Sequence, residues 1–173
     1  EVVGVSEGTY RRHGAMAEYL TVPHWIAVHM PEGLGFEQAA LIETASIGVH
    51  AANRTPIALN ASVVVVGAGA VGLVSLQAIR LKGAGKLGIT DLSEERLEMA
   101  KEMGADVTVK ADSPDLLEQL RQATGPKGAD ATLEAVGVQA TIDTALEITR
   151  KGGSLTLIGN VMPRVEMGLQ SIV

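Results

Sequence analysis

The 173-residue chain contains no cysteine. Disulfides and thiolate zinc sites are therefore excluded within these residues, which leaves the redox compartment open and the cytoplasm as the default expectation. No apolar run approaches the roughly 20 residues that a membrane-spanning helix needs, and the first residues lack the basic-then-apolar profile of a signal peptide. We expect neither export nor membrane insertion.

The chain also lacks a cluster of basic residues. Its 14 lysines and arginines stand against 20 aspartates and glutamates, for a net charge of −6. This balance argues against nucleic acid as a partner. With 46% hydrophobic residues the chain can bury a sizeable core, and its length predicts one main domain with an attachment.

One stretch organises the sequence. Four consecutive valines, Val63–Val66, are typical of a strand buried on both faces, and glycines follow at Gly67, Gly69 and Gly72 in the G-x-G-x-x-G spacing. Helical periodicity begins directly after them. In such a turn the first glycine permits a tight bend, the second lets the backbone approach a pyrophosphate, and the third lets the helix pack close to the strand.

Strands and helices alternate after this turn. Further strands are predicted at residues 86–91, 107–109, 131–136 and 154–159, and helices at 93–103, 115–123 and 139–149, with a turn at 151–153. This order predicts an α/β fold with a doubly wound parallel sheet, whose ligand lies beyond the carboxyl ends of the strands. A complete two-half fold has six strands. Residues 163–173 are interpreted as a leader towards the sixth.

The region before the valines is different. Residues 17–23 and 24–30 are predicted to be extended, and helices are predicted at about 36–42 and 44–53. The chain begins with Glu1 and its first residues are typical of the inside of a domain, so we expect a fragment of a longer protein.

Asp91 ends the second predicted strand, about 20 residues past the glycines. A carboxylate at this point can accept both ribose hydroxyls of an adenosine and repels the additional phosphate of NADP, so Asp91 favours NAD. Alternatively, Asp91 only caps the helix that begins near Ser93.

Several segments, in order, carry a resemblance to a known family. They are residues 14–23 (GAMAEYLTVP), 39–43 (AALIE), the glycine turn, 91–106, 128–130 (GAD), 134–137 (EAVG) and 151–159 (KGGSLTLIG). Together they resemble the zinc-dependent medium-chain dehydrogenases of the alcohol dehydrogenase superfamily, and the sorbitol/polyol and threonine dehydrogenase branch is the nearest. The resemblance spans nearly the whole chain.

The resemblance implies a partial GroES-like catalytic domain with connecting helices at residues 1–52, and an NAD-binding Rossmann domain without its last strand at residues 53–173. The positions that it places at the cofactor are Gly67, Gly69, Val71, Gly72, Asp91, Arg96, Ile158, Gly159 and Asn160. Asp91 and Arg96 would hold the adenosine ribose, and Ile158 to Asn160 would line the nicotinamide end. Asn160 departs from the apolar residue usual there, and Arg96 has an alternative role as an ion-pair partner of Asp91.

The resemblance also places Glu43 at the catalytic zinc, as a direct ligand or through water. The family commonly has Glu-Pro here, whereas this chain has Glu43-Thr44. The apolar residues before Glu43 favour a partly buried carboxylate, which would need a partner. The alternative is an ordinary surface glutamate. The other zinc ligands of the family precede the region where this chain begins.

The function implied is NAD-dependent oxidation of a secondary alcohol or polyol to a ketone, with zinc-assisted hydride transfer in the full-length enzyme. This chain would supply the cofactor-binding part and be inactive alone, and the full-length enzyme would be a homo-oligomer, a dimer or tetramer. Three alternatives stay open: a zinc-free quinone or enone reductase of the same superfamily, a non-catalytic NAD-binding module, and a methyltransferase.

Overall fold

The computed structural model describes residues 3–4 and 14–172, and it divides the chain into two compact units, Glu1–Ala39 and Ala40–Val173. In the first unit, the described residues form a short 3-10 helix, η1 (His24–Ile26), and the beginning of α1 (Phe36–Ala40). The His24 and Trp25 rings form a T-shaped pair, with the ring centroids 5.4 Å apart.

The prediction of strand-like structure at residues 17–23 and 24–30 is wrong. Residues 17–23 form no strand, and residues 24–26 form a helical turn. A strand is stable only when neighbouring strands accept and donate its backbone hydrogen bonds. Residues 14–39 contain no second strand that could do so.

The second unit is built on a five-stranded parallel sheet with the order β3-β2-β1-β4-β5. Its strands are β1 (Ser62–Val66), β2 (Lys86–Asp91), β3 (Val107–Lys110), β4 (Ala129–Glu134) and β5 (Thr149–Leu157). Its helices are α2 (Ile42–Arg54), α3 (Ala70–Leu81), α4 (Glu94–Glu102), α5 (Leu116–Thr124), α6 (Gln139–Ile148) and α7 (Leu169–Ile172). The predicted α/β class and doubly wound sheet are confirmed.

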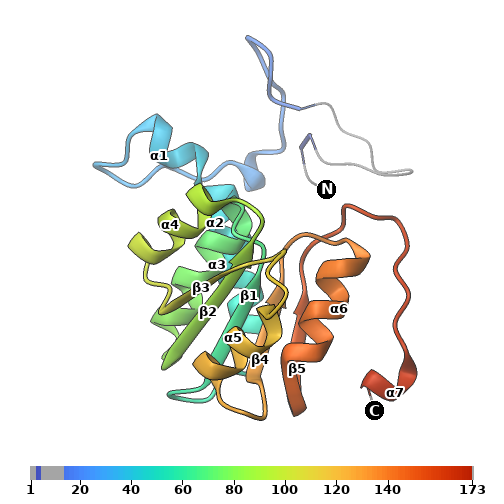
Figure 1. Ribbon diagram of the computed structural model, residues 1–173. Helices are drawn as coiled ribbons and strands as arrows, with labels where there is room; N and C mark the ends of the chain where they lie inside the picture. Colours follow the sequence, from blue (N-terminus) through green and yellow to red (C-terminus); the bar gives the residue numbers. More distant parts are fainter. Residues whose placement is uncertain (1–2, 5–13, 173) are drawn as a thin grey trace. The chain divides into compact units, whose positions relative to one another are not determined.

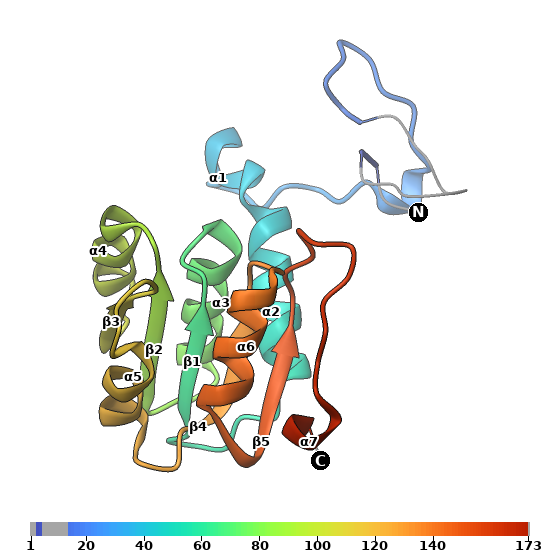
Figure 2. The same ribbon diagram turned by 45° about the vertical axis from the view of Figure 1, so that its right-hand side comes forward.

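Helices cover both faces of the sheet (Figures 1 and 2). Val63 and Val65 face a core that includes α2, α3 and α4, whereas Val64 and Val66 face a second core with α5 and α6. All four valines are buried, which is why β1 tolerates no polar alternation. The strand order reverses between β1 and β4, so the carboxyl ends of these two strands mark the switch point.

Besides small shifts at the ends of several elements, two segments differ in kind from the prediction. The expected turn at 151–153 lies inside β5, because the pairing of β4 with β5 shifts register between Ala129 and Ala131 and absorbs extra residues there. From the sequence, residues 163–173 are interpreted as leading towards a sixth strand, but Leu169–Ile172 form the short helix α7. None of the described helices is long and apolar enough to cross a membrane.

An ion pair ties three strands together at the amino ends of the sheet. Asp130 Oδ1 accepts a hydrogen bond from Arg150 Nε at 2.7 Å, and Asp130 Oδ2 accepts from Ser62 N at 2.8 Å. The hydrogen bond from Arg150, with that from the Ser62 backbone, lowers the pKa of Asp130 below its ordinary value of 3.8. The folded state therefore binds the Asp130 proton less readily than the unfolded chain does.

We expect the substitution Asp130→Asn to destabilise the fold at pH 7 by about 0.5–1 kcal/mol, a figure already reduced for partial exposure of the pair to solvent. Because the folded-state pKa is lowered, the charged pair contributes fully above pH 3.8 and its contribution is lost as the pH falls through the lower value. Urea unfolding of the wild type and of Asp130→Asn, from pH 7 to below pH 3.8, measures the difference in their free energies of unfolding. A difference between them that did not shrink below pH 3.8 would contradict the role of the charge.

Candidate functional site

The glycine turn joins the end of β1 to the start of α3. Gly67 has a φ of +102°, a conformation that favours glycine, and its N–H donates to Thr90 O on β2 at 2.8 Å. Gly69 is the N-cap of α3 and is extended, with φ −70° and ψ 179°. Among the described residues no side chain caps this helix, so the first N–H groups of α3 are left for another partner.

The three glycines have different surroundings. A Cβ atom on Gly72 would collide with the Gly67 carbonyl oxygen, and one on Gly67 would come within 2.5 Å of Val136 Cγ2. A Cβ on Gly69 would meet nothing within 4 Å. Packing therefore requires glycine at 67 and 72, whereas Gly69 faces open space at the amino end of α3.

Asp91 connects the end of β2 to the glycine turn. Its Oδ2 accepts a hydrogen bond from Ala68 N at 2.7 Å, and its Oδ1 accepts from Ser93 N at 2.9 Å. The N-cap of α4 is Ser93 itself, whose hydroxyl accepts from Arg96 N at 3.3 Å. Asp91 therefore holds two backbone segments but is not the helix cap, and each of its oxygens keeps a lone pair for a further donor.

Arg96 lies beside Asp91 without a hydrogen bond to it. Its Nη1 is 3.8 Å from Asp91 Oδ2, and its side chain is 59% exposed against 11% for Asp91. The ion-pair alternative for Arg96 is therefore present in the structure. The pair is weak by its geometry, because a charge-assisted hydrogen bond would be about 1 Å shorter, so Arg96 is free to turn towards a ligand.

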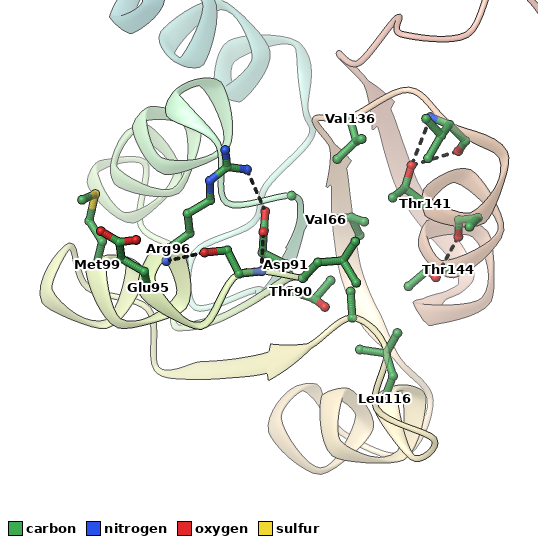
Figure 3. A pocket seen from close by; sticks show the side chains of 16 residues that line it. Val66, Thr90, Asp91, Glu95, Arg96, Met99, Leu116, Val136, Thr141 and Thr144 are labelled. Carbon is green, nitrogen blue, oxygen red and sulfur yellow. Dashed lines mark hydrogen bonds and ion pairs between the residues drawn. The ribbon is translucent and has the colours of Figure 1, made fainter.

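A pocket of about 780 Å³ opens at the carboxyl ends of β1 and β2, between α4 and α6 (Figure 3). Its volume lies within the usual range for small-molecule sites. The residues that line it are Val66, Gly67, Thr90, Asp91, Leu92, Ser93, Glu95, Arg96, Met99, Ala111, Leu116, Val136, Val138, Ala140, Thr141 and Thr144. Within the described part of the chain the buried Thr90 hydroxyl, at the base of the pocket, has no hydrogen-bond partner.

The sequence placed only some of these residues at the site. Gly67, Asp91 and Arg96 line the pocket, and Gly69, Val71 and Gly72 follow on the adjoining turn and helix. The wall from α6, with Thr141 and Thr144, was missed, because its residues are distant in the chain and carry no motif. The only available signal was the topological rule that strand ends on both sides of the switch point meet.

Strand β5 is followed by Ile158, Gly159 and Asn160. In the sheet, β4 lies between β5 and β1, the strand that leads into the glycine turn. The N–H groups of Ile158 and Gly159 both donate to Glu134 O, at 2.8 and 3.1 Å. Ile158 packs against the core on the α3 side, whereas Asn160 is exposed. None of the three lines the pocket in Figure 3.

Glu43 lies in the first turn of α2 and is exposed, so the expectation of a partly buried carboxylate is wrong. The neighbouring Leu41 and Ile42 are themselves 60% and 48% exposed, and the apolar approach therefore does not enter the core. Among the described residues, no three His, Asp or Glu side chains gather into a group that could hold a metal ion.

Comparison with known proteins agrees with this architecture. A family model described as "Zinc-binding dehydrogenase" matches residues 70–173, which is more than half of the chain. The chain belongs to the zinc-binding dehydrogenase family. The resemblance stated from the sequence is thereby confirmed at the level of the family.

Two relatives show what kinds of enzyme this zinc-binding dehydrogenase chain is similar to. It is 37% identical over 146 residues to sorbitol dehydrogenase of Bacillus subtilis, covering 84% of the chain and 41% of the relative. It is 33% identical over 156 residues to L-idonate 5-dehydrogenase of Vitis vinifera, covering 88% and 43%. The chain thus spans less than half the length of these relatives.

A solved structure from Sinorhizobium meliloti, with NADP bound, is similar in fold. It superposes with a TM-score of 0.84 at 28% identity, over 93% of this chain and 48% of that one. The arrangement of the parallel sheet and its helices therefore recurs in a protein that holds a dinucleotide.

The glycines give a direct test of the site. We expect Gly69→Ala to leave the free energy of unfolding within about 0.5 kcal/mol of wild type, since its backbone angles are allowed and its Cβ meets nothing. The same methyl group should weaken dinucleotide binding by about tenfold or more if the pyrophosphate approaches here. Urea unfolding and titration with NADH measure the two quantities.

Gly72→Ala is the matched control, because the same methyl group collides inside the protein. It should lower the free energy of unfolding by about 1–3 kcal/mol. Unchanged NADH affinity in a folded Gly69→Ala protein would contradict the assignment of this open space to a ligand.

Proposed function

We propose that this chain is the cofactor-binding part of an NAD-dependent dehydrogenase that oxidises a secondary alcohol or polyol to a ketone. The family and the sorbitol and L-idonate dehydrogenase relatives support the class of reaction. The observation that carries the cofactor assignment is the open space at Gly69, which adjoins the uncapped amino end of α3 and the Asp91 carboxylate.

These features fit the parts of a dinucleotide. The uncapped N–H groups of α3 and the positive end of its dipole suit the pyrophosphate. Asp91 can accept the hydroxyls of the adenosine ribose with the lone pairs that Ala68 and Ser93 leave free. The pocket between α4 and α6 suits the adenine, since its walls are mainly apolar with a few polar groups.

When bound, the nicotinamide ring of NAD⁺ accepts the hydride that leaves the alcohol. The chain's own part is to position that ring. We assign Val71, Ile158, Gly159 and Asn160 to this end of the cofactor. The hydrogen bonds from Ile158 and Gly159 to Glu134 O hold the 158–160 segment against β4, so the backbone there can set the distance of the ring from the glycine turn.

The described residues do not fit a complete zinc site. Glu43 is a single exposed carboxylate, whereas catalytic zinc sites use three protein ligands. Zinc in the whole enzyme, with Glu43 as one contributor, is part of the proposal, but the chemistry assigned to this chain is confined to the dinucleotide.

The choice of NAD over NADP rests on charge. The Asp91 carboxylate is mostly buried at the pocket edge, where it would lie next to a phosphate on the ribose. The negative charges of the carboxylate and of this neighbouring phosphate would repel strongly in a partly desolvated site. Arg96 could offset this repulsion only by leaving Asp91, although the similar structure from S. meliloti shows that the fold itself also accommodates NADP.

The proposal extends to a small alcohol or polyol as the substrate partner, to a homo-oligomeric full-length enzyme and to the cytoplasm as its location. The free edge of β5 in the described sheet is compatible with the addition of a strand from a continuing chain or from another subunit.

We expect this chain to bind NADH more tightly than NADPH. Asp91→Ala should lower NADH affinity by about tenfold, because the ribose loses an acceptor and the turn loses its contact with Ala68. NADPH affinity should fall less or rise, because the repulsion is removed. Fluorescence titration with both nucleotides gives the ratio.

Glu95→Gln is the control for general charge, because Glu95 lines the same pocket but lies on α4, away from the end of β2 where Asp91 contacts the glycine turn. It should leave the NADH to NADPH ratio within about twofold. A wild-type preference for NADPH, or an equal shift in both variants, would contradict the role of Asp91.

A further inference from the structure

Glu134 is a buried acidic residue whose side chain the cofactor assignment does not use. It ends β4 and is 0% exposed. Its Oε1 accepts hydrogen bonds from Val136 N at 2.9 Å and from Gly137 N at 2.8 Å. Its Oε2 is buried without a hydrogen-bond partner in the described part of the chain.

Such a residue is costly. A buried carboxylate oxygen without a partner forgoes its hydration, and an apolar side chain of similar size at this position would avoid that cost. What the carboxylate provides is local: it fixes two consecutive N–H groups of the turn between β4 and α6. We define this turn as residues 135–137.

The turn touches both halves of the proposed cofactor site. On one side, Val136 lines the pocket and presses against Gly67, where a Cβ atom would come within 2.5 Å of Val136 Cγ2. On the other side, Gly137 O accepts a hydrogen bond from Met162 N at 2.8 Å. A movement of the turn would therefore shift the pocket wall and the segment after β5 together.

The contacts on the second side leave no room for adjustment. Gly137 has a φ of +86°, and a Cβ there would collide with the backbone of Gly159 and Asn160. A Cβ on Gly159 would in turn collide with the backbone of Val136 and Gly137. The backbones of the turn and of the 159–160 segment are thus in direct contact.

From these contacts we infer that Glu134 is a positioning residue for dinucleotide binding. Its Oε1 holds the turn in the one place where Val136 closes the adenosine side and Gly137 supports the nicotinamide side. The inference rests on the proposed function, because it assigns a cofactor to both sides of the turn.

The test compares four variants of the 173-residue chain with the wild type. Glu134→Leu keeps a buried side chain of similar size but removes the acceptor, whereas Glu134→Gln keeps an accepting oxygen at the same reach. Glu134→Asp retains a carboxyl group but draws its oxygens back by one methylene, and it serves as the test if the leucine variant does not fold. Thr132→Val is the matched control, because Thr132 is buried on the same strand and bonded to Thr149, away from the turn.

We expect Glu134→Leu and Glu134→Asp to weaken NADH binding by about tenfold, with Glu134→Gln and Thr132→Val within about twofold of wild type. Amide hydrogen exchange at Val136 and Gly137 should become faster in Glu134→Leu and Glu134→Asp but not in the other two variants. NADH affinity that is retained in both Glu134→Gln and Thr132→Val would show that the other two variants lose affinity because the turn moves, and not because the fold is destabilised in general.

Two results would overturn the inference in different ways. If the wild-type chain binds NADH but folded Glu134→Leu or Glu134→Asp binds it equally well, the inference fails and the proposed function stands. If the wild-type chain binds neither NADH nor NADPH, the proposed function fails and this inference fails with it.

Discussion

The close approach of Gly72 to the carbonyl oxygen of Gly67 is the constraint on which the rest of the structure depends. It lets α3 begin directly at the end of β1, where a side chain at either position would force helix and strand apart. Because β1 is the central strand, with β2 and β4 as its neighbours, this contact fixes where α3 points over the switch point. The open space at Gly69 exists only because the glycines on either side of it have closed the turn.

Two carboxylates complete the arrangement, one at the end of each strand beside β1. Asp91 on β2 holds Ala68 and Ser93, and Glu134 on β4 holds Val136 and Gly137, each through backbone N–H groups. The loops beside the pocket are thus held partly by carboxyl groups at the ends of the sheet strands, in addition to the contacts that the loops make with one another. Asp91 is partly accessible to a ligand, whereas Glu134 is fully buried and can act only through the turn that it holds.

The sequence predicted the sheet well because local pattern and tertiary role agree there. The run Val63–Val66 is apolar because β1 is buried on both faces, and the glycine spacing follows from contacts within a few residues. Prediction failed where the outcome depends on distant partners. Residues 17–23 have strand-like composition but no described neighbour to pair with, and the turn at 151–153 is absorbed into β5 by the register of its partner β4. Glu43 was expected to be partly buried from its apolar neighbours, yet these neighbours are exposed themselves.

The proposed dinucleotide site of this zinc-binding dehydrogenase chain lies across its glycine turn. The most direct measurement is a titration of isotopically labelled chain with NAD⁺, followed residue by residue through the backbone amide signals in NMR. We expect saturable shifts at Gly69, Ala70 and Val71, with further shifts at Ser93 and Val136 on the pocket wall. Saturable shifts confined to other parts of the chain, or no saturable shift at all, would contradict it.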